Sequence, residues 1–455
     1  MRRVFGCLTW GVITLPAAAF AATPVTTDRI AGHEVWTAAA SPYLVEQDLT
    51  VLSDAELVLE PGVEVRFANH DVAGVGLDPT RVELVVLGAL RANGTAASPI
   101  VLGAQEGDFA NSWSGVRIAP SSTEASLSHV TIEAAKTALE SAAPAQALSV
   151  TSCTLRKSFE GLHIVAGAPR LSGLKLESNS VSGLHLESIT ARADLVLENS
   201  VVRLNGSYGI LLEVGHAQDM NASITSSTIY GNTSAGITIQ AQGTTRTVVK
   251  VTGSIVSSNG ILGIDSRALD GASVDTQVTY SNVVDNGMSF AGVTAGDGCV
   301  SEPPTFVDAP WNLRLATGSP CIDSADTASS SATDIDGTAR PVGDASDMGA
   351  YEYTAMATDQ AGQAGQAGQA GAPSTAGATS TAGATSTAGA TSTAGATSTA
   401  NPSVSGGMST SNVGRPDSSG GCSCNLGPKQ PGAPWSMPLG LFAGFRRRRR
   451  RHRRW

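Results

Sequence analysis

Apolar residues along the middle of the chain come in short alternating runs. Runs such as those at 201–204, 210–212 and 248–251 are separated by Gly, Asn and Ser. Apolar residues that alternate over a few positions indicate strands, whereas a stable helix needs a 3.6-residue period over a longer stretch. The pattern therefore predicts many short strands joined by turns, and no long helix.

A spaced pair of Asn and Gly marks a repeat in this region. The unit is an Asn, three residues, then a Gly followed by an aliphatic residue. It begins at Asn179, Asn205, Asn232 and Asn259, and Asn286 continues the series. These asparagines lie 26 or 27 residues apart. Short strands at such a period describe a chain that winds once per repeat and hydrogen-bonds each coil to the next.

Weaker copies of the repeat extend it upstream. They run through Gly62, Gly88 and Gly115, which are again 26 and 27 residues apart. The predicted fold is all-β: a right-handed parallel β-helix, a solenoid of roughly ten coils with 22–27 residues in each.

The repeat also predicts where its side chains point. Asn adopts the left-handed turn conformation at low cost, and stacked Asn side chains can hydrogen-bond along a ladder. We therefore expect a structural column of asparagines. After each repeat glycine the first and third residues are mostly apolar and should point inward, so the second and fourth should point outward.

The outward positions bring together a candidate functional cluster. His163 and His185 should stack on adjacent coils, about 5 Å apart at the backbone, with Glu187 and Glu213 in a second column beside them. Such a cluster could bind a transition metal or work as acid and base on a sugar. The alternative is a solvated polar face with no ligand.

Acidic charge dominates the body of the chain. The 455 residues have a formal net charge of −10, but ten of the 29 basic residues are arginines at the two ends: Arg2, Arg3 and eight between 446 and 454. Without these ten, 19 basic residues face 39 acidic ones, a net charge of −20. Such an acidic body argues against a nucleic-acid partner.

Residues 1–21 have the pattern of a secretory signal peptide. Arg2 and Arg3 precede an apolar run at 4–15, and the Ala-Phe-Ala at 19–21 fits a cleavage site. An N-terminal anchor helix is the alternative, but the run is shorter than the ~20 residues that a membrane span needs. We therefore expect an exported protein.

Export makes disulfides available. Cys299 and Cys321 are the natural pair, because they lie 22 positions apart in one loop-rich segment. A disulfide there would stabilise the fold by roughly 3 kcal/mol on the loop-entropy model. Cys153 lies within a strand-like repeat, so we expect it to be a buried free thiol.

The first coils resemble a known group of proteins. The segments at 41–45, 57–65, 87–95 and 113–116 look like the opening coils of bacterial right-handed β-helix repeat proteins. The resemblance covers roughly residues 35–295.

A second resemblance lies downstream. The segments at 313–323, 334–337 and 347–352 are similar to the module called choice-of-anchor Q. The resemblance implies a surface protein, with a loop-rich C-terminal cap at 299–353 after a β-helix at 22–298.

Acidic residues gather in this cap. Asp334 and Asp336 are candidate calcium ligands, and calcium is the cofactor that they suggest. Carboxylates that build turns are the alternative.

The tail completes the resemblance to surface proteins. Residues 354–421 are low-complexity repeats, which predicts a disordered linker. Residues 422–455 hold Cys422, Cys424, a short apolar stretch at 435–445 and the arginine run, and resemble the MYXO-CTERM sorting signal. The resemblance implies passage through the membrane, processing by a sorting protease and display on the cell surface. The apolar stretch is shorter than a full span, and a basic nucleic-acid-binding tail is the alternative.

These observations lead to two functional hypotheses. The first is a monomeric, exported β-helix at the cell surface, structural or adhesive, whose long face binds extracellular polysaccharide. The second is a carbohydrate-active enzyme, a polysaccharide lyase or glycoside hydrolase, that uses the cluster of histidines and glutamates. An enzyme would need several acids and a base that converge within a few ångströms.

Overall fold

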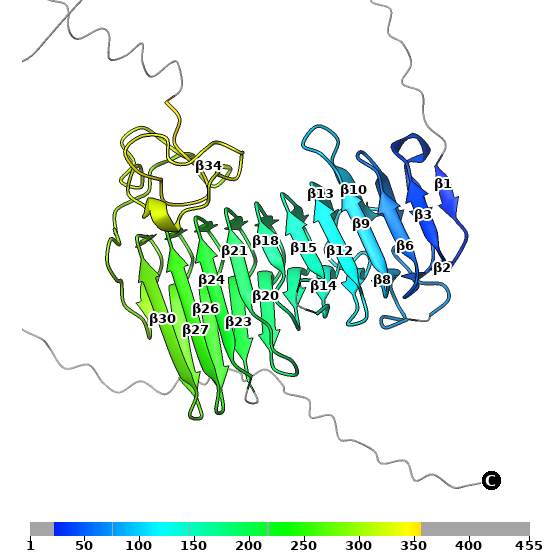
Figure 1. Cartoon of the computed structure of the whole chain (residues 1–455), viewed down its shortest axis with the longest axis horizontal. Coiled ribbons are helices and arrows are strands. Elements are labelled where there is room, and N and C mark those ends of the chain that lie inside the picture. The colour runs from blue at the N-terminus through cyan, green and yellow to red at the C-terminus, as the bar shows by residue number, and fades with distance from the viewer. Residues whose placement is uncertain (1–21, 75, 145, 216–217, 356–455) are drawn as a thin grey trace, which may run out of the picture. The chain divides into compact units, whose positions relative to one another are not determined.

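The computed structural model describes residues 22–355, apart from 75, 145, 216 and 217. Within this part the chain is almost entirely strand and turn, and three long parallel sheets run along a stack of coils (Figure 1). We call these sheets A, B and C. Each sheet takes one strand from each successive coil. The chain is therefore a right-handed parallel β-helix, as the sequence predicted.

Some of the predicted segments lie outside the described residues. They are the signal peptide, nearly all of the linker, Cys422, Cys424 and the rest of the sorting tail. The described part contains the short 3-10 helices η1 (Ala38–Ala40) and η2 (Thr327–Ser329). No helix in the described part is long and apolar enough to cross a membrane.

Sheet A has eleven strands. In spatial order they are β1 (Thr23–Val25), β4 (Tyr43–Val45), β7 (Glu64–Phe67), β10 (Ile100–Ala104), β13 (Val130–Glu133), β16 (Thr154–Arg156), β19 (Lys175–Glu177), β22 (Val201–Arg203), β25 (Thr228–Tyr230), β28 (Ile255–Ser257) and β31 (Asn282–Val284).

Sheet B also has eleven strands and carries the candidate cluster. They are β2 (Arg29–Ile30), β5 (Leu49–Val51), β8 (Glu83–Val86), β11 (Gly115–Ile118), β14 (Thr137–Ser141), β17 (Glu160–Ile164), β20 (Ser182–Ser188), β23 (Tyr208–Val214), β26 (Ala235–Gln242), β29 (Leu262–Leu269) and β32 (Met288–Ala291).

Sheet C has ten strands. They are β3 (His33–Trp36), β6 (Glu56–Leu59), β9 (Ala89–Asn93), β12 (Glu124–Ser128), β15 (Leu148–Thr151), β18 (Arg170–Ser172), β21 (Leu195–Glu198), β24 (Met220–Thr225), β27 (Arg246–Thr252) and β30 (Ser273–Thr279).

The early coils do not keep the predicted period. Val65 pairs with Leu102, and Leu102 with Ile132, so these two coils are 37 and 30 residues long. The upstream series of glycines is therefore wrong as a repeat. Gly62 lies between β6 and β7, Gly88 lies between β8 and β9, and Gly115 begins β11. The coils can vary in length because the additional residues lie in the turns, while the paired strands stay short.

The asparagine column forms the predicted ladder. The Oδ1 atom of Asn205 accepts hydrogen bonds from the backbone N–H and the Nδ2 of Asn179, at 3.1 and 3.0 Å. Asn232, Asn259 and Asn286 repeat both bonds in turn at 2.9–3.0 Å. Each amide also donates to a backbone carbonyl, such as that of Leu176 for Asn205. The ladder thus satisfies polar groups that would be costly to bury alone.

The repeat glycines make room for this ladder. A Cβ atom on Gly209 would lie 2.8 Å from Nδ2 of Asn232 and 2.6 Å from the carbonyl oxygen of Gly236. The spacing of Asn and Gly therefore reflects close packing. The left-handed conformation, in contrast, belongs to the residue before the asparagine, as at Ser178 and Leu204, whose φ angles are 57° and 55°.

A second ladder, of serines, was not predicted. The backbone N–H of Ser200 donates to Oγ of Ser227 at 3.2 Å, and Ser227, Ser254 and Ser281 continue the column at the same spacing of 27 residues. Each of these hydroxyls donates in turn to the carbonyl two residues earlier. Serine is common throughout the sequence, so its period is a weaker signal than that of the Asn-Gly pair.

The C-terminal segment at 299–353 folds back along sheet A. Its strands β33 (Phe306–Asp308) and β34 (Asn312–Leu315) form an antiparallel pair (Figure 1). Arg203 on β22 donates to the carbonyl oxygens of Pro310 and Trp311 at 2.6 and 2.9 Å. The backbone N–H of Ala350 donates to Oγ1 of Thr228 on β25 at 2.9 Å. The segment thus covers the side of the last coils.

The predicted disulfide in this segment is wrong. Cys299 and Cys321 are free thiols. The sulfur of Cys299 lies 3.3 Å from the carbonyl oxygen of Val278, whereas that of Cys321 accepts a hydrogen bond from Nδ2 of Asn282 at 3.1 Å. The buried Cys153 is also a free thiol, as predicted.

Candidate functional site

The candidate cluster lies on the outer face of sheet B. His163 on β17 pairs with His185 on β20, and Glu187 on β20 pairs with Glu213 on β23. The residues on either side of the two histidines are fully buried core residues: Leu162, Ile164, Leu184 and Leu186. Strand alternation therefore turns the histidines and glutamates outward, and the sequence predicted this placement.

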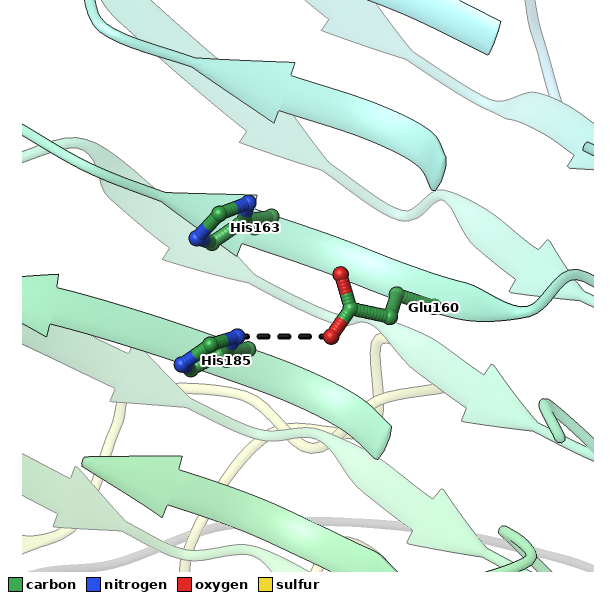
Figure 2. Close-up of side chains that lie close together, drawn as sticks. All are labelled: Glu160, His163 and His185. Atoms are coloured by element: carbon green, nitrogen blue, oxygen red, sulfur yellow. Dashed lines mark hydrogen bonds and ion pairs between the residues drawn. The ribbon is translucent and has the colours of Figure 1, made fainter. Parts of the chain in front are cut away.

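The two imidazole rings stack on one another. Their centroids are 4.6 Å apart and their planes are inclined by 9°. Figure 2 shows Glu160, from the start of β17, beside both rings. Its Oε1 lies 3.3 Å from Nδ1 of His185, and Oε2 of Glu213 lies 2.9 Å from Nε2 of the same ring. Both ring nitrogens of His185 therefore contact carboxylates.

This arrangement stabilises the charged form of His185. Burial of the ring opposes the charge, but the hydrogen bonds to Glu160 and Glu213 overcome it and raise the pKa of His185 to about 9. The hydrogen bond to His185 lowers the pKa of Glu213. Burial opposes ionisation of Glu160, and the bond to His185 nevertheless lowers the pKa of this carboxyl as well. At neutral pH the cluster is a cation between two anions.

His163 makes weaker contacts than His185. Its Nε2 is buried without a hydrogen bond, and Oε2 of Glu187 lies 3.5 Å away. The distance allows an ion pair, but the structure forms no hydrogen bond between them. His163 is thus held mainly by ring stacking.

Glu160 is the member of the cluster that the sequence did not predict. It lies directly before the repeat glycine Gly161, whereas the outward positions were counted after that glycine. Strict alternation from the inward Leu162 would place residue 160 inward. The carboxylate nevertheless reaches His185 on the outer face. The sequence signal that could have revealed Glu160 is Gly161, because a glycine can interrupt the alternation of side chains along a strand.

Three members of the cluster have the donor atoms of a metal site. One ligand atom each from Glu160, His163 and His185 lies within 4.8 Å of the other two. Zinc and similar metals bind deprotonated nitrogen and carboxylate donors. Carboxylates contact both nitrogens of His185, and the ring keeps its proton. The protonated ring therefore already supplies the positive charge that a metal ion would bring to these carboxylates.

The polar face continues toward the N-terminal coils. In the same column as the two histidines, Glu140 on β14 pairs with His163, and Arg117 on β11 forms a 2.6 Å ion pair with Glu140. A small pocket of about 70 Å³ lies at this end of the face. Its charged lining residues are Asp78, Glu83, Arg117, Lys136 and Glu140.

A second concave surface lies on the outer face of sheet C. It is a shallow groove of about 470 Å³ across β21, β24 and β27. Val196 and Val248 line it together with Asp194 and Lys250. The groove is more apolar than the histidine face.

The candidate calcium ligands in the C-terminal segment have other partners. Oδ1 of Asp334 accepts from the backbone N–H groups of Asp336 and Thr338 at 2.9 and 2.7 Å, and Oδ2 accepts from that of Glu352 at 2.9 Å. Asp336 forms an ion pair with Arg314. The carboxylate of Asp334 therefore builds a turn, and no contact joins the two carboxylates as a ligand pair.

Comparisons with known proteins agree with the architecture. The family model of the right-handed beta helix region matches residues 114–297, which include the histidine cluster. No curated protein matches the sequence. A solved structure of pectate lyase Pel9A is similar, with 12% sequence identity and a TM-score of 0.34, over 66% of this chain and 88% of that chain. The family match, together with the three parallel sheets, shows that the chain contains a right-handed β-helix region.

Proposed function

We propose that this protein is an exported β-helix displayed at the cell surface, where the outer face of sheet B binds extracellular polysaccharide without cleaving it. Its role is structural or adhesive. The face offers a row of charged side chains on successive coils, from Arg117 through Glu140 to His185. Carboxylates accept hydrogen bonds from sugar hydroxyls, and the guanidinium of Arg117 has several N–H groups to donate.

One observation carries the choice of binding over catalysis. Both nitrogens of His185 contact carboxylates, and its pKa is raised to about 9. A general base has to accept a proton at the working pH. A ring that is already protonated at neutral pH cannot remove a proton from a sugar, so His185 does not supply the base that a lyase needs.

A glycan array with product analysis tests this proposal. The full chain is screened on the array, and every bound polysaccharide is then incubated with the protein and examined for shorter or unsaturated products. The double variant His185→Ala, Glu187→Ala removes the centre of the face. Arg170→Ala, at an exposed position on sheet C, is the matched control.

The expected result is binding without products. Binding should be lost in the double variant and retained in Arg170→Ala. If the wild type forms products and the double variant does not, the protein is a polysaccharide lyase or glycoside hydrolase and not an adhesin. No binding across the array would remove polysaccharide as the ligand.

Surface display is supported by the two ends of the sequence. The signal-peptide pattern at 1–21 and the cysteine, apolar and arginine pattern at 422–455 fit export followed by processing of the tail by a sorting protease. Protease treatment of intact cells should release the β-helix. A chain with Cys422→Ser and Cys424→Ser should instead stay protected inside the cell, and equal release of both chains would contradict a role of the cysteines in sorting.

A further inference from the structure

A long turn encloses a group of carboxylates at the other end of sheet B. Residues 68–82 connect β7 to β8 within the 37-residue coil. The carboxylates in and under this turn belong to residues that are at most 8% exposed: Asp48, Asp71, Asp78 and Glu83. So many buried anions need cations, protons or hydrogen-bond donors.

The chain balances Asp78 with its own cations. Oδ2 of Asp78 lies 3.1 Å from Nζ of Lys136 and 3.1 Å from Nη1 of Arg81. Burial opposes ionisation of Asp78, but the hydrogen bonds from Thr80 and Lys136 nevertheless lower the pKa of this carboxyl. Asp78 is therefore a satisfied anion.

Asp48 and Glu83 are not paired with such a cation, although the charge of Arg117 acts on Glu83 from a distance and opposes the effect of burial on its pKa. Within the described part of the chain, neither residue forms an ion pair with Lys, Arg or His. Oδ1 of Asp48 accepts from the backbone N–H of Glu83 at 3.0 Å, but Oδ2 is buried without any hydrogen bond. Asp48 is itself 8% exposed. A buried carboxylate oxygen with no partner is costly and needs an explanation.

The unpartnered oxygen of Asp48 and a carboxylate oxygen of Glu83 both lie beside Gly76. A Cβ atom on Gly76 would collide with both Oδ2 of Asp48 and Oε1 of Glu83, so the two oxygens border the same small space. Gly76 has a φ of 74° and brings its backbone close to both carboxylates. The next residue, Leu77, donates its backbone N–H to Oε1 of Glu83 at 2.7 Å. The turn thus packs its backbone against both carboxylates.

We propose that Asp48 and Glu83 bind a hard divalent cation, of which calcium is the best fit, and that this ion fastens the 68–82 turn onto sheet B. Calcium prefers carboxylate oxygens and completes its shell with backbone carbonyls and water. It also tolerates irregular geometry, which suits two side chains that meet at a turn. Burial and the neighbouring Glu83 penalise the unbound charge of Asp48, so a cation there stabilises the folded state.

This site is independent of the polysaccharide proposal. It uses different side chains, and its test needs no glycan. The full chain is freed of metal with a chelator, and calcium chloride is added at pH 7.5 in a calorimetric titration. Thermal unfolding is then followed with and without calcium. Magnesium chloride serves as a comparison, because Mg²⁺ demands stricter octahedral geometry.

The variants remove one ligand at a time with little change in shape. Asp48→Asn keeps the oxygen that accepts from Glu83, and Glu83→Gln is the equivalent change at the partner. Asp28→Asn removes an exposed carboxylate paired with Arg29 and is the matched control. We expect calcium to raise the Tm of the wild type and of the control by several degrees. Asp48→Asn and Glu83→Gln should lose that rise and the heat of binding.

Two outcomes would overturn the proposal. The first is no heat of binding and no change in Tm with either ion. The second is an equal response in Asp48→Asn and the wild type, which would place the ion elsewhere.

Discussion

The two halves of the β-helix stack their coils in different ways. From β19 onward the coils settle to 26 or 27 residues, and buried Asn and Ser ladders hold equivalent turns in register. The N-terminal coils vary between 20 and 37 residues. There, charged pairs on the outer faces link neighbouring coils, as between Arg91 and Glu124 at 2.9 Å.

The difference shows what a side-chain ladder demands. An amide can bond the next coil only if every coil places it at the same point, so an insertion near the turn would break the column. Coils without a ladder are free to lengthen their turns, and one such turn encloses Asp48 and Glu83. Regular coils stabilise the rod, and irregular coils create enclosed polar sites.

The largest expected effect comes from breaking the ladder at Asn232. In Asn232→Ala the backbone N–H and Nδ2 of Asn205 lose their shared acceptor. At about 1–3 kcal/mol for each orphaned buried donor, the free energy of unfolding should fall by roughly 2–6 kcal/mol. Chemical denaturation measures it. Asn221→Ala, at an exposed position on β24, is the control and should change little; equal losses would contradict the ladder.

The next effect concerns His185, the cation of the regular half. Its pKa is about 9 in the folded state and about 6.5 when unfolded. The folded state therefore binds the proton more tightly, so this stabilisation is complete below pH 6.5 and is lost as the pH rises through 9. The loss should be on the order of 3 kcal/mol.

Denaturation at pH 6 and at pH 9.5 measures this loss. His185→Gln should remove most of the difference between the two pH values. His33→Gln, which removes an exposed His paired with Glu56, is the matched control and should keep the difference. An unchanged pH dependence in His185→Gln would mean that the two carboxylates do not hold the proton.

A smaller effect tests the close packing beside the ladder. Gly209→Ala places a methyl group 2.8 Å from Nδ2 of Asn232, closer than real contacts allow. Overpacking of this kind costs about 1–3 kcal/mol. Gly215→Ala on the next turn is the control, because its Cβ would meet atoms of Gln242 and Ile189 at ordinary distances of 3.5–3.6 Å. Equal stability of the two variants would contradict the packing argument.

The two halves also differ in how far the sequence predicts them. The period of Asn179, Asn205 and their successors revealed the parallel stack and placed His163 next to His185, because one repeat equals one coil. Asp48 and Glu83 escaped prediction because they lie in neighbouring coils without the motif, and pairing across 35 residues leaves no periodic signal. The docking of the C-terminal segment on sheet A depends on contacts between residues about 100 positions apart, which local patterns do not carry.

The smallest expected effect tests how the regular half holds the C-terminal segment. Arg203 binds Glu177 and the carbonyls of Pro310 and Trp311 at the same time through three separate nitrogens of its guanidinium, whereas a lysine has a single nitrogen for all three partners. Arg203→Lys should therefore loosen the β33–β34 pair by about 1 kcal/mol, and its amides should exchange faster with solvent in hydrogen exchange.

The matched control for this change lies in the same column of sheet A. Arg156 pairs with Glu133 at 2.8 Å, and its hydrogen bonds reach no residue of the C-terminal segment. Arg156→Lys should leave the exchange of β33 and β34 unchanged. If the amides of β33 and β34 exchanged as slowly in both variants as in the wild type, the segment would be held by its apolar contacts, such as Phe306 against Tyr230. The regular coils would then serve as a flat packing surface, and their charges would add little to the docking.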